Sequence, residues 1–417
     1  MSKISSVAVI GLGYIGLPTA AILADNGLRV HGVDVNPNTV AAVNAGSVPF
    51  VEPALGDFVA RTVAAGQLTA SVEPPAADAY IVAVPTPFLE NKTPDLSYIE
   101  AAGRTLAAQL SGDELIILES TSPPGATERL ADVVHEARPD LAAAGTLQFA
   151  HAPERVLPGK IMEELVTNDR IIGGSTPEAA ERAVELYRSF CQAELVTTDT
   201  RTAEMAKLVE NSFRDVNIAF ANELSMIADE IGVDVWEVIE LANRHPRVNI
   251  LQPGPGVGGH CIAVDPWFIV AAAPDTATII RSAREINDAK PDWVIHQIKA
   301  EAFDVQQETG RTPVIATLGL AFKPNIDDLR ESPALNITEA LAEQFTQSKI
   351  LTVEPHIDEL PPRLQGRDNL QLADVEAALD QADIVVLLVD HAAFADLGPK
   401  AYEKRVIDTR GQWRDNK

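Results

Sequence analysis

Short apolar runs alternate with alanine-rich stretches over residues 1–150 of the chain. A run of four or five consecutive apolar residues is typical of a parallel strand that is covered on both faces. Because the stretches between the runs are helical in pattern, the alternation predicts a doubly wound α/β fold. The expected strands are Val7–Ile10, Arg29–Val33, Tyr80–Val84 and Leu115–Leu118.

The pattern changes near residue 200. Thr202–Asp229 contains neither Gly nor Pro and is expected to form one long helix. Helical sequence continues through Trp236–Ile239 and again from Ala277 to Phe303. A helix as long as the first usually joins domains or forms a subunit interface.

A second α/β region begins near Pro313, after the polar segment Gln306–Thr312, which is expected to be a linker. Its expected strands are Val314–Leu318, Ile384–Val389 and Val406–Asp408. The fold class predicted for the chain is therefore α/β. Two Rossmann-like doubly wound domains are joined by a central helical region that contains a long helix.

Composition limits the kind of partner. The 417 residues include 33 Lys and Arg against 60 Asp and Glu, which gives a net charge of −27. A nucleic acid or an anionic membrane is not expected as a partner, because the general basic surface that binds them is missing. A local basic pocket remains compatible with this charge.

Two cysteines cannot build a disulfide framework, which favours a reducing compartment and a cytoplasmic location. The apolar run after Met1–Ser6 is too brief for a signal peptide, and no stretch approaches the ~18 uninterrupted apolar residues of a membrane span. The histidines and cysteines show no metal-ligand spacing, so no metal site is expected.

The first expected strand runs directly into Gly11-Leu12-Gly13-Tyr14-Ile15-Gly16 and then into a helix. In this context Gly11 permits a tight turn, Gly13 admits a pyrophosphate close to the backbone, and Gly16 lets helix and strand pack closely. Asp34 ends the second strand, where an acid binds a ribose 2′-hydroxyl and repels a 2′-phosphate. The motif predicts a dinucleotide and favours NAD over NADP, although FAD would also fit.

A glycine-rich segment, Pro253–Cys261, is the least ordinary part of the chain. It places Cys261 on a loop that can approach a ligand closely, with Asp265 four residues later. The cysteine is a candidate nucleophile, and a small buried apolar residue is the alternative that its type alone leaves open. Cys191 has a plain helical context and is expected to be a packing residue.

Lys207 and Asn211 lie four residues apart in the expected long helix and therefore share a face. A cation beside an amide donor can stabilise an oxyanion. A solvated helix face is the alternative reading of the same pair.

Several motifs occur in one order along nearly the whole chain, and together they resemble the nucleotide-sugar 6-dehydrogenase family, which includes UDP-glucose dehydrogenase. These motifs are Gly11–Gly16, Ser120-Thr121, Pro153–Gly159, Lys207–Asn211, Gly258–Cys261 and Phe322–Asn325. The resemblance implies oxidation of a primary alcohol at sugar C6 to a carboxylate, with two NAD and one water. It also implies a homodimer built on the central helical region.

The resemblance further implies catalytic roles. Cys261 would trap the aldehyde as a thiohemiacetal and carry the later thioester, while Lys207 and Asn211 would stabilise the oxyanion. Thr121 and Asp265 would position a water, and Glu154 would act as a base in thioester hydrolysis. The choice of main base between Glu154 and Asp265 stays open.

Ligand contacts are implied for two further groups of residues. The cofactor-binding group comprises Gly11, Gly13, Tyr14, Ile15, Gly16, Asp34, Thr86, Thr121 and Arg330. The substrate-binding group comprises Glu154, Arg155, Val156, Leu157, Lys160, Lys207, Asn211, Arg214, Arg247, Gly258, His260 and Lys323. Arg247 matches a family arginine that reaches the substrate from the neighbouring subunit.

Pro153–Gly159 and Asn243–Gly256 are most similar to the branch of this family that acts on UDP-N-acetyl-D-mannosamine. The glucose branch usually carries a second Glu where Pro158 stands, so UDP-glucose is disfavoured. UDP-N-acetylglucosamine, UDP-N-acetylgalactosamine and UDP-glucose remain alternatives, and the implied role is precursor synthesis for surface polysaccharide. The expected domains are an NAD-binding domain (1–200), a central helical domain (201–305) and a UDP-sugar-binding domain (306–417).

Two other classes of function fit part of the chain. A two-electron hydroxyacid dehydrogenase shares the Rossmann head and helical middle but has no use for Cys261. A non-catalytic regulator that binds NAD or a nucleotide sugar needs none of the six catalytic candidates named above.

Overall fold

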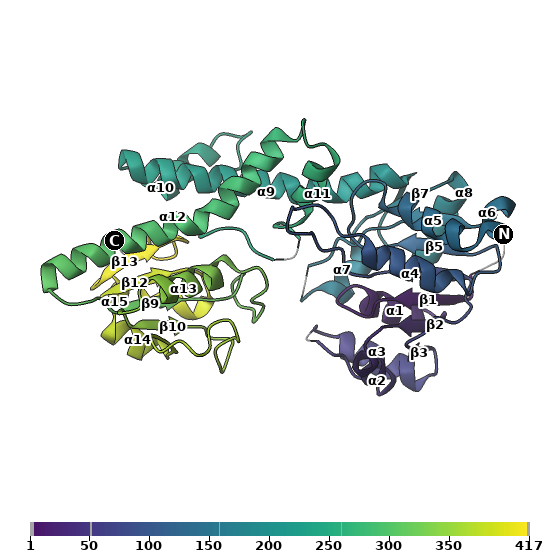
Figure 1. Ribbon diagram of the computed structural model, residues 1–417, viewed down its shortest axis with the longest axis horizontal. Coiled ribbons are helices and arrows are strands. Elements are labelled where there is room, and N and C mark those ends of the chain that lie inside the picture. Colours follow the sequence, from purple (N-terminus) through teal and green to yellow (C-terminus); the bar gives the residue numbers. More distant parts are fainter. Residues whose placement is uncertain (1–3, 51, 158, 260, 415–417) are drawn as a thin grey trace. The chain divides into compact units, whose positions relative to one another are not determined.

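The computed structural model describes residues 4–50, 52–157, 159–259 and 261–414 (Figure 1). It contains two compact units. The first comprises Met1–Glu210 and Trp267–Ala273, and the second comprises Asn211–Pro266 and Pro274–Lys417.

The first unit is a doubly wound α/β fold. Among its described residues, eight strands form one sheet in the order β3-β2-β1-β4-β5-β6-β7-β8, parallel except for the β6–β7 pair. The order reverses between β1 and β4, and ligands bind beside such a reversal in open α/β sheets. Its elements are β1 (Ser6–Ile10), α1 (Gly16–Asp25), β2 (Arg29–Val33), α2 (Pro37–Asn44), α3 (Leu55–Ala64), β3 (Leu68–Ser71), β4 (Ala79–Val82), α4 (Ser97–Ala107), β5 (Leu115–Leu118), α5 (Ala126–Ala137), α6 (Pro139–Ala144), β6 (Gln148–His151), α7 (Ile161–Thr167), β7 (Arg170–Gly174), α8 (Pro177–Tyr187) and β8 (Leu195–Asp199).

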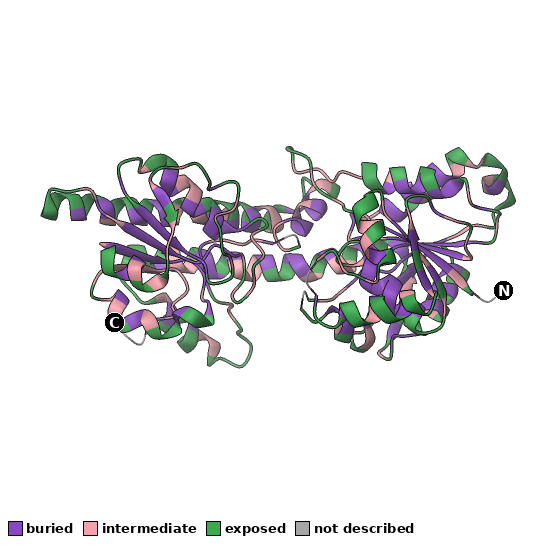
Figure 2. Cartoon of the chain, turned by 90° about the horizontal axis from the view of Figure 1, so that it is seen from below, coloured by how far each residue is buried: buried purple, intermediate pink, exposed green. Residues whose placement is uncertain are grey.

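Both faces of the first sheet are covered by helices, as the apolar strands require. Val7 and Val9 of β1 pack in one core with α1, α3 and α8, whereas Ala8 and Ile10 pack in a second core with α4 and α5. This alternation is the period-two geometry of a strand buried on both sides. Figure 2 shows the strands of this sheet as buried and the outer faces of the helices as exposed.

Four helices follow the first sheet along the chain. They are α9 (Thr200–Ile231), α10 (Val235–Asn243), α11 (Asp265–Ala272) and α12 (Thr278–Thr309). In the second unit, α9 and α12 are joined by a buried ion pair in which Arg284 Nη1 lies 2.6 Å from Asp215 Oδ1. The long helix expected at Thr202–Asp229 is confirmed and extends by two residues at each end.

The second unit contains a smaller sheet of the same kind. Its described strands follow the order β11-β10-β9-β12-β13, are all parallel, and reverse in order between β9 and β12. Helices α12 and α13 cover one face and α14 the other. Its elements are β9 (Ile315–Leu318), α13 (Pro333–Gln344), β10 (Ile350–Val353), β11 (Leu370–Leu372), α14 (Val375–Gln381), β12 (Ile384–Leu387), the 3₁₀ helix η1 (Ala392–Leu397), α15 (Gly398–Ala401) and β13 (Arg405–Asp408).

The predicted fold class is confirmed, and each strand named from the sequence is present with bounds within two residues of those expected. The linker expected at Gln306–Thr312 is wrong in its first half, because α12 continues to Thr309 and ends at Gly310, whose φ is +69°. The segment is polar but contains no helix breaker before that glycine. Glu308 of this last turn also pairs with Arg405 of β13 at 2.5 Å.

Within the described residues, no helix is both long enough and apolar enough to cross a membrane.

Candidate active site

The glycine turn stands at the strand-order reversal of the first sheet. Gly11 follows β1 with φ +95°, and a Cβ at this position would lie 2.5 Å from the carbonyl oxygen of Ala83, which follows β4. A Cβ at Gly16 would lie 1.9 Å from the Gly11 carbonyl oxygen. Larger residues are therefore excluded at both positions by neighbouring backbone.

Gly13 differs from these two glycines because nothing lies within 4 Å of the position its Cβ would take. The space beside its backbone is open, and in the described part of the chain no side chain caps the start of α1. The first amide N–H groups of that helix are thus available to an anion. Tyr14 is 37% exposed and stacks on Phe50 with ring centroids 4.2 Å apart, while Ile15 is half-buried.

Asp34 is placed where the sequence predicts it, directly after β2. Its Oδ2 accepts a hydrogen bond from the Leu12 amide at 3.0 Å, and its Oδ1 accepts one from the Asn36 amide at 2.8 Å. The first bond fastens the carboxylate to the glycine turn, and the remaining lone pairs can accept from a ribose hydroxyl. The open Gly13 backbone, the uncapped helix and this carboxylate together fit a dinucleotide.

Thr86 and Thr121 are brought together at the same edge of the sheet. The Thr86 hydroxyl donates to the Thr121 carbonyl oxygen at 2.5 Å. Beyond Thr121, the chain is held to the start of α9 by the buried Glu204 carboxylate, which accepts from the Gly125 amide at 2.6 Å and the Thr127 amide at 2.8 Å. Because Glu204 precedes Lys207 by three residues on α9, this bond fixes the helix end that carries Lys207 to the loop that carries Thr121.

Glu154 belongs to a buried group of charges that the sequence does not reveal. Its Oε2 lies 2.5 Å from Arg170 Nη2, and its Oε1 accepts from the Arg155 amide at 2.6 Å. The same guanidinium lies 3.3 Å from Glu119 Oε1, which also accepts from the Tyr187 hydroxyl. All three charged side chains are at most 6% exposed, so two carboxylates share one buried arginine.

Burial and the neighbouring Glu154 carboxylate raise the pKa of Glu119 to about 7, against the lowering effect of Arg170. The cause is general: taking a carboxylate out of water disfavours its charged form, and a second carboxylate nearby adds to this. One arginine cannot neutralise both acids, so this group gains or releases a proton near neutral pH.

The residues after Glu154 point in different directions. Arg155 pairs with Glu210 of α9 at 2.8 Å, Val156 packs against the core of the first sheet, and Leu157 is 47% exposed. Lys160 is exposed at the start of α7. The group expected to bind substrate is therefore divided, with Leu157 and Lys160 open to solvent and Arg155 anchored to α9.

In the second unit, Asn211 and Asp265 form a buried pair. Asn211 Nδ2 donates to Asp265 Oδ2 at 2.5 Å, and the two residues are 8% and 3% exposed. Asp265 begins α11, and its amide donates at 2.9 Å to the carbonyl oxygen of Cys261. Cys261 itself is exposed, whereas Cys191 is buried and serves packing as expected. Lys207, one turn before Asn211 on α9, lies in the first unit and is half-buried.

The glycines before Cys261 are required by packing against the loop that follows β9. A Cβ at Gly258 would lie 2.4 Å from the Glu331 carbonyl oxygen and 2.9 Å from Phe322 Cβ. A Cβ at Gly259 would lie 2.9 Å from the Phe322 ring. The turn that carries the candidate nucleophile is therefore in direct contact with the segment that contains Lys323.

Lys323 and Arg330 stand on that segment at the strand-order reversal of the second sheet, and both are exposed. Arg330 Nη2 pairs with Asp328 of the same loop at 2.6 Å. Arg214 on α9 and Arg247 after α10 are also exposed. His260, expected to contact substrate, lies outside the described residues.

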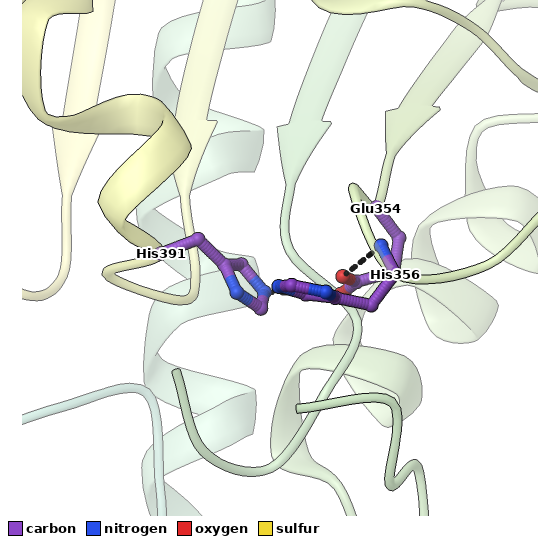
Figure 3. Close-up of side chains that lie close together, drawn as sticks. All are labelled: Glu354, His356 and His391. Atoms are coloured by element: carbon purple, nitrogen blue, oxygen red, sulfur yellow. Dashed lines mark hydrogen bonds and ion pairs between the residues drawn. The ribbon is translucent and has the colours of Figure 1, made fainter. Parts of the chain in front are cut away.

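Glu354, His356 and His391 form a cluster with the spacing of metal ligands (Figure 3). Their hydrogen bonds do not fit a resident metal. His391 Nδ1 accepts from the Asn325 amide at 2.9 Å, so its proton is on Nε2, which faces Glu354 Oε2 at 3.1 Å. Neither ring nitrogen of His391 is therefore available to a cation.

The sequence did not indicate Glu119, Arg170 or Glu204 as part of the site. Glu119 and Arg170 are 51 residues apart, and a buried charge has no local signature. One signal was available: Arg170 opens an otherwise apolar strand, and a charged residue in a buried strand needs a buried partner.

The chain matches three family models over most of its length. Residues 5–191 match the NAD binding domain of the UDP-glucose/GDP-mannose dehydrogenase family. Residues 201–289 match the central domain of that family, and residues 316–415 match its UDP binding domain.

Characterised relatives cover almost the whole chain. An NDP-N-acetyl-D-galactosaminuronic acid dehydrogenase from Ralstonia nicotianae is 57% identical over 98% of this chain and 96% of its own. A UDP-N-acetyl-D-mannosamine dehydrogenase from Salmonella typhi is 54% identical over 98% and 99%. The solved structure of a UDP-D-ManNAc dehydrogenase from Pyrococcus horikoshii matches with a TM-score of 0.84 at 36% identity, covering 98% of this chain and 96% of that one.

The titration of Glu119 predicts an effect of Glu119→Gln on stability. The pKa of Glu119 is about 7 in the folded chain, against about 4.3 when unfolded. The free energy of unfolding of the wild-type protein therefore falls as pH rises from about 4.3 through about 7. Glutamine has no proton to lose, so the variant gains on the order of 2 kcal/mol over wild type between pH 5 and pH 8. Urea unfolding followed by circular dichroism at both pH values measures this gain.

Glu114→Gln is the matched control with the opposite sign. Burial would raise the pKa of Glu114, but hydrogen bonds from Ser111 and Gly112 hold it below the ordinary value. Its ionised form is therefore stabilising, and the variant is expected to lose stability at pH 8. A Glu119→Gln variant that is equally destabilised at both pH values would show that Glu119 is ionised in the folded protein.

Proposed function

The chain belongs to the UDP-glucose/GDP-mannose dehydrogenase family, and on that basis we propose that it oxidises UDP-N-acetyl-D-mannosamine to UDP-N-acetyl-D-mannosaminuronate. It is an NAD-dependent nucleotide-sugar dehydrogenase, and the proposed reaction converts the C6 primary alcohol to a carboxylate. The product would serve as a precursor of surface polysaccharide.

One observation carries the four-electron reaction. The turn of Cys261 packs against the loop of Lys323, at the strand-order reversal of the second sheet. A sulfur nucleophile beside a nucleotide site can hold a sugar aldehyde and its thioester on the protein until water releases the acid. A two-electron dehydrogenase has no use for this arrangement.

The choice of sugar is supported by the relatives. The mannosamine enzymes of Salmonella typhi and Escherichia coli are 54% and 53% identical to this chain over nearly its whole length. UDP-N-acetyl-D-galactosamine is the second candidate, because a relative named for N-acetyl-D-galactosaminuronic acid is 57% identical. UDP-N-acetylglucosamine and UDP-glucose rank below both.

NAD is the cofactor, and the residues beside β1 fit it. Gly11, Gly13 and the start of α1 would bind its pyrophosphate, and Asp34 its adenosine ribose. When bound, NAD accepts one hydride in each of the two oxidations. Tyr14, Ile15, Gly16, Thr86, Thr121 and Arg330 complete the proposed cofactor site.

In the first oxidation the C6 hydroxyl would release its proton to water and its hydride to NAD, which leaves an aldehyde, and we assign stabilisation of the intervening alkoxide to α9. Lys207 supplies a positive charge and Asn211 an amide donor to the developing oxyanion. Asn211 is fixed in orientation by its bond to Asp265, which uses one of its two amide hydrogens and leaves the other for substrate.

The later steps are assigned to Cys261 and the acids. The Cys261 thiolate attacks the aldehyde carbon to form a thiohemiacetal, whose oxidation gives a thioester. Asp265 and Thr121 position a water on that thioester, and Glu154 accepts the water proton as its oxygen attacks. The tetrahedral adduct then expels the Cys261 thiolate, and the acid releases its remaining proton and leaves as the carboxylate.

The substrate contacts are proposed residue by residue. Lys323 and Arg247 would bind the diphosphate, while Gly258 keeps the loop backbone close to the ligand. The remaining proposed contacts are Glu154, Arg155, Val156, Leu157, Lys160, Lys207, Asn211, Arg214 and His260.

A homodimer is proposed from the exposed face of α9. Phe213, Phe220, Ile227 and Ile231 are 68%, 50%, 45% and 65% exposed, and their spacing places them along one side of the helix. Apolar side chains in such a row favour burial against a second copy. We also propose a cytoplasmic location, since Cys261 must remain a reduced thiol, and the domain division 1–200, 201–305 and 306–417.

A panel of UDP-sugars tests the proposed function. UDP-N-acetyl-D-mannosamine is expected to be oxidised fastest, with a ratio of NADH formed to sugar consumed close to two, measured by absorbance and chromatography. A ratio close to one with a released aldehyde or ketone would contradict the four-electron reaction. Preference for UDP-N-acetyl-D-galactosamine would instead replace the proposed sugar by the second candidate.

Cys261→Ser is expected to reduce formation of the acid at least about a thousandfold, because a serine hydroxyl ionises far less readily than a thiol and is the weaker nucleophile. The steady-state rate of uronate formation measures the effect. Cys191→Ser is the matched control, since that cysteine is buried and serves packing, and its rate should stay close to wild type. Unchanged turnover in Cys261→Ser would refute the thioester route.

A mixture of inactive variants tests whether Arg247 acts in the neighbouring subunit. Arg247→Ala and Cys261→Ser are each expected to be nearly inactive. If one site takes Cys261 from one copy and Arg247 from the other, co-refolded mixed dimers contain one complete site. The mixture should then recover roughly a quarter of wild-type activity. Activity no higher than the sum of the two variants alone would place Arg247 in its own subunit's site.

A further inference from the structure

Three strand ends of the second sheet are tied together by one carboxylate. Glu354 follows β10, and its Oε2 accepts hydrogen bonds from the amides of Leu320 at 2.7 Å and Ala321 at 3.0 Å, which follow β9. The same oxygen accepts a hydrogen bond at 3.1 Å from Nε2 of His391, a residue that follows β12. Glu354 is 4% exposed and His391 is fully buried.

His391 passes this constraint to the loop that contains Lys323. Its Nδ1 accepts the Asn325 amide proton at 2.9 Å. A neutral imidazole that accepts at Nδ1 must carry its proton at Nε2, so the bond to Glu354 fixes the tautomer that the Asn325 bond requires. Figure 3 shows Glu354, His356 and His391 clustered together, with the His356 ring between the other two side chains in this view.

Asn325 is held at a second point. Its Oδ1 accepts from the Ala392 amide at 2.9 Å, and its backbone is left-handed with φ +62°. A non-glycine residue keeps such a backbone only where surrounding bonds hold it. The loop is thus fastened two residues after Lys323, by both the backbone and the side chain of Asn325.

The same loop supports the turn of the nucleophile. Phe322 precedes Lys323, and its side chain occupies the space that side chains at Gly258 and Gly259 would need. These glycines lie two and three residues before Cys261. A continuous set of contacts therefore runs from Glu354 through His391 and Asn325 to the Lys323 loop, and from Phe322 to the Cys261 turn.

We propose that Glu354 and His391 are positioning residues that hold the Lys323 loop in the shape that binds the uridine diphosphate group of the substrate. This rests on the proposed function, because it takes that loop as a nucleotide-binding element. The pair touches no reacting atom and acts through Asn325. Loss of the bond between His391 and Asn325 weakens nucleotide binding. Phe322 is held separately, because its amide donates to the Asp328 carbonyl oxygen at 3.1 Å, so the Cys261 turn and the chemical steps are left intact.

Two substitutions of His391 separate its two bonds. In His391→Asn the side-chain oxygen takes the place of Nδ1 and still accepts from the Asn325 amide. In His391→Gln the longer amide reaches Glu354 in place of Nε2 and leaves the Asn325 amide without its acceptor. His356→Gln is the matched control, because His356 is the exposed member of the cluster.

Calorimetric titration with UDP, which needs no turnover, measures the effect. His391→Gln is expected to raise the Kd for UDP about tenfold, whereas His391→Asn and His356→Gln stay within about threefold of wild type. The KM for UDP-sugar should follow the Kd, with kcat and the Kd for NAD nearly unchanged. A general loss of structure would move all of these quantities together and would not be rescued by asparagine.

Asn325→Gly provides a second measurement that does not disturb the buried pair. It keeps the left-handed backbone and removes the bond to Ala392, and we expect an increase of about fivefold in the Kd for UDP. Unchanged UDP affinity in both His391→Gln and Asn325→Gly would overturn the proposal. So would a UDP affinity that EDTA abolishes and Zn²⁺ restores, since the cluster would then be a metal site.

Different results would refute the proposed function and the positioning role. A wild-type protein that binds UDP but oxidises no UDP-sugar would refute the reaction, while the Kd comparison among the variants would still test the positioning role. A wild-type protein that binds no UDP would refute the role of the Lys323 loop and the positioning role with it.

Discussion

Both sheets depend on the close passage of two chain segments at the point where the strand order reverses. Gly11 follows β1 and Gly319 follows β9, with φ of +95° and +97°. A Cβ at Gly11 would lie 2.5 Å from the carbonyl oxygen of Ala83, which follows β4. A Cβ at Gly319 would lie 2.4 Å from the Cβ of Val389, which follows β12. Open α/β sheets bind ligands at such reversals, and the glycine turn and the Lys323 loop stand at these two points.

This construction explains how a chain with a net charge of −27 can bind two anionic ligands. At the first reversal, the backbone amides at the uncapped start of α1 are available to an anion, and they add nothing to the net charge. At the second reversal, the exposed Lys323 stands on a loop that is fastened by the bonds of Asn325 to His391, which in turn bonds to Glu354. The excess of acidic residues over the rest of the surface then discourages non-specific polyanions without preventing the specific ones.

The fold was predictable where one local pattern decided the structure. Apolar runs such as Leu115–Leu118 identified strands, because a fully buried parallel strand needs no polar face. Six of the described strands, β3, β6, β7, β8, β10 and β11, were not named from the sequence. Of these, β6 (Gln148–His151) and β8 (Leu195–Asp199) are short and mix polar with apolar residues. The end of α12 was also missed, because its last turn is stabilised by Arg405, nearly a hundred residues later in the chain.

The site divides in the same way. The glycine turn, Asp34, Cys261 and the Lys207–Asn211 pair were visible because each lies within one local motif. Glu119, Arg170 and the Glu354–His391 pair were not, because these residues meet their partners only in the folded sheet and bind other side chains or the backbone. Buried charges are expensive unless paired, so such pairs are set by long-range geometry that a single sequence does not display.

The contact between Phe322 and the glycines before Cys261 also determines which parts of the chain can be inherited separately. The polar segment that begins at Gln306 suggests a domain boundary at which two homologous chains could be joined in a chimera, between the helical region and the second sheet. Such a chimera would take the turn of Cys261 from one parent and the loop of Phe322 from the other. The two segments are so closely packed at Gly258 that a small shift of either would cause a clash. A join within α9, after Glu210, keeps both from one parent. The glycine-rich turn, although distant in sequence, is thus part of the module that recognises the nucleotide.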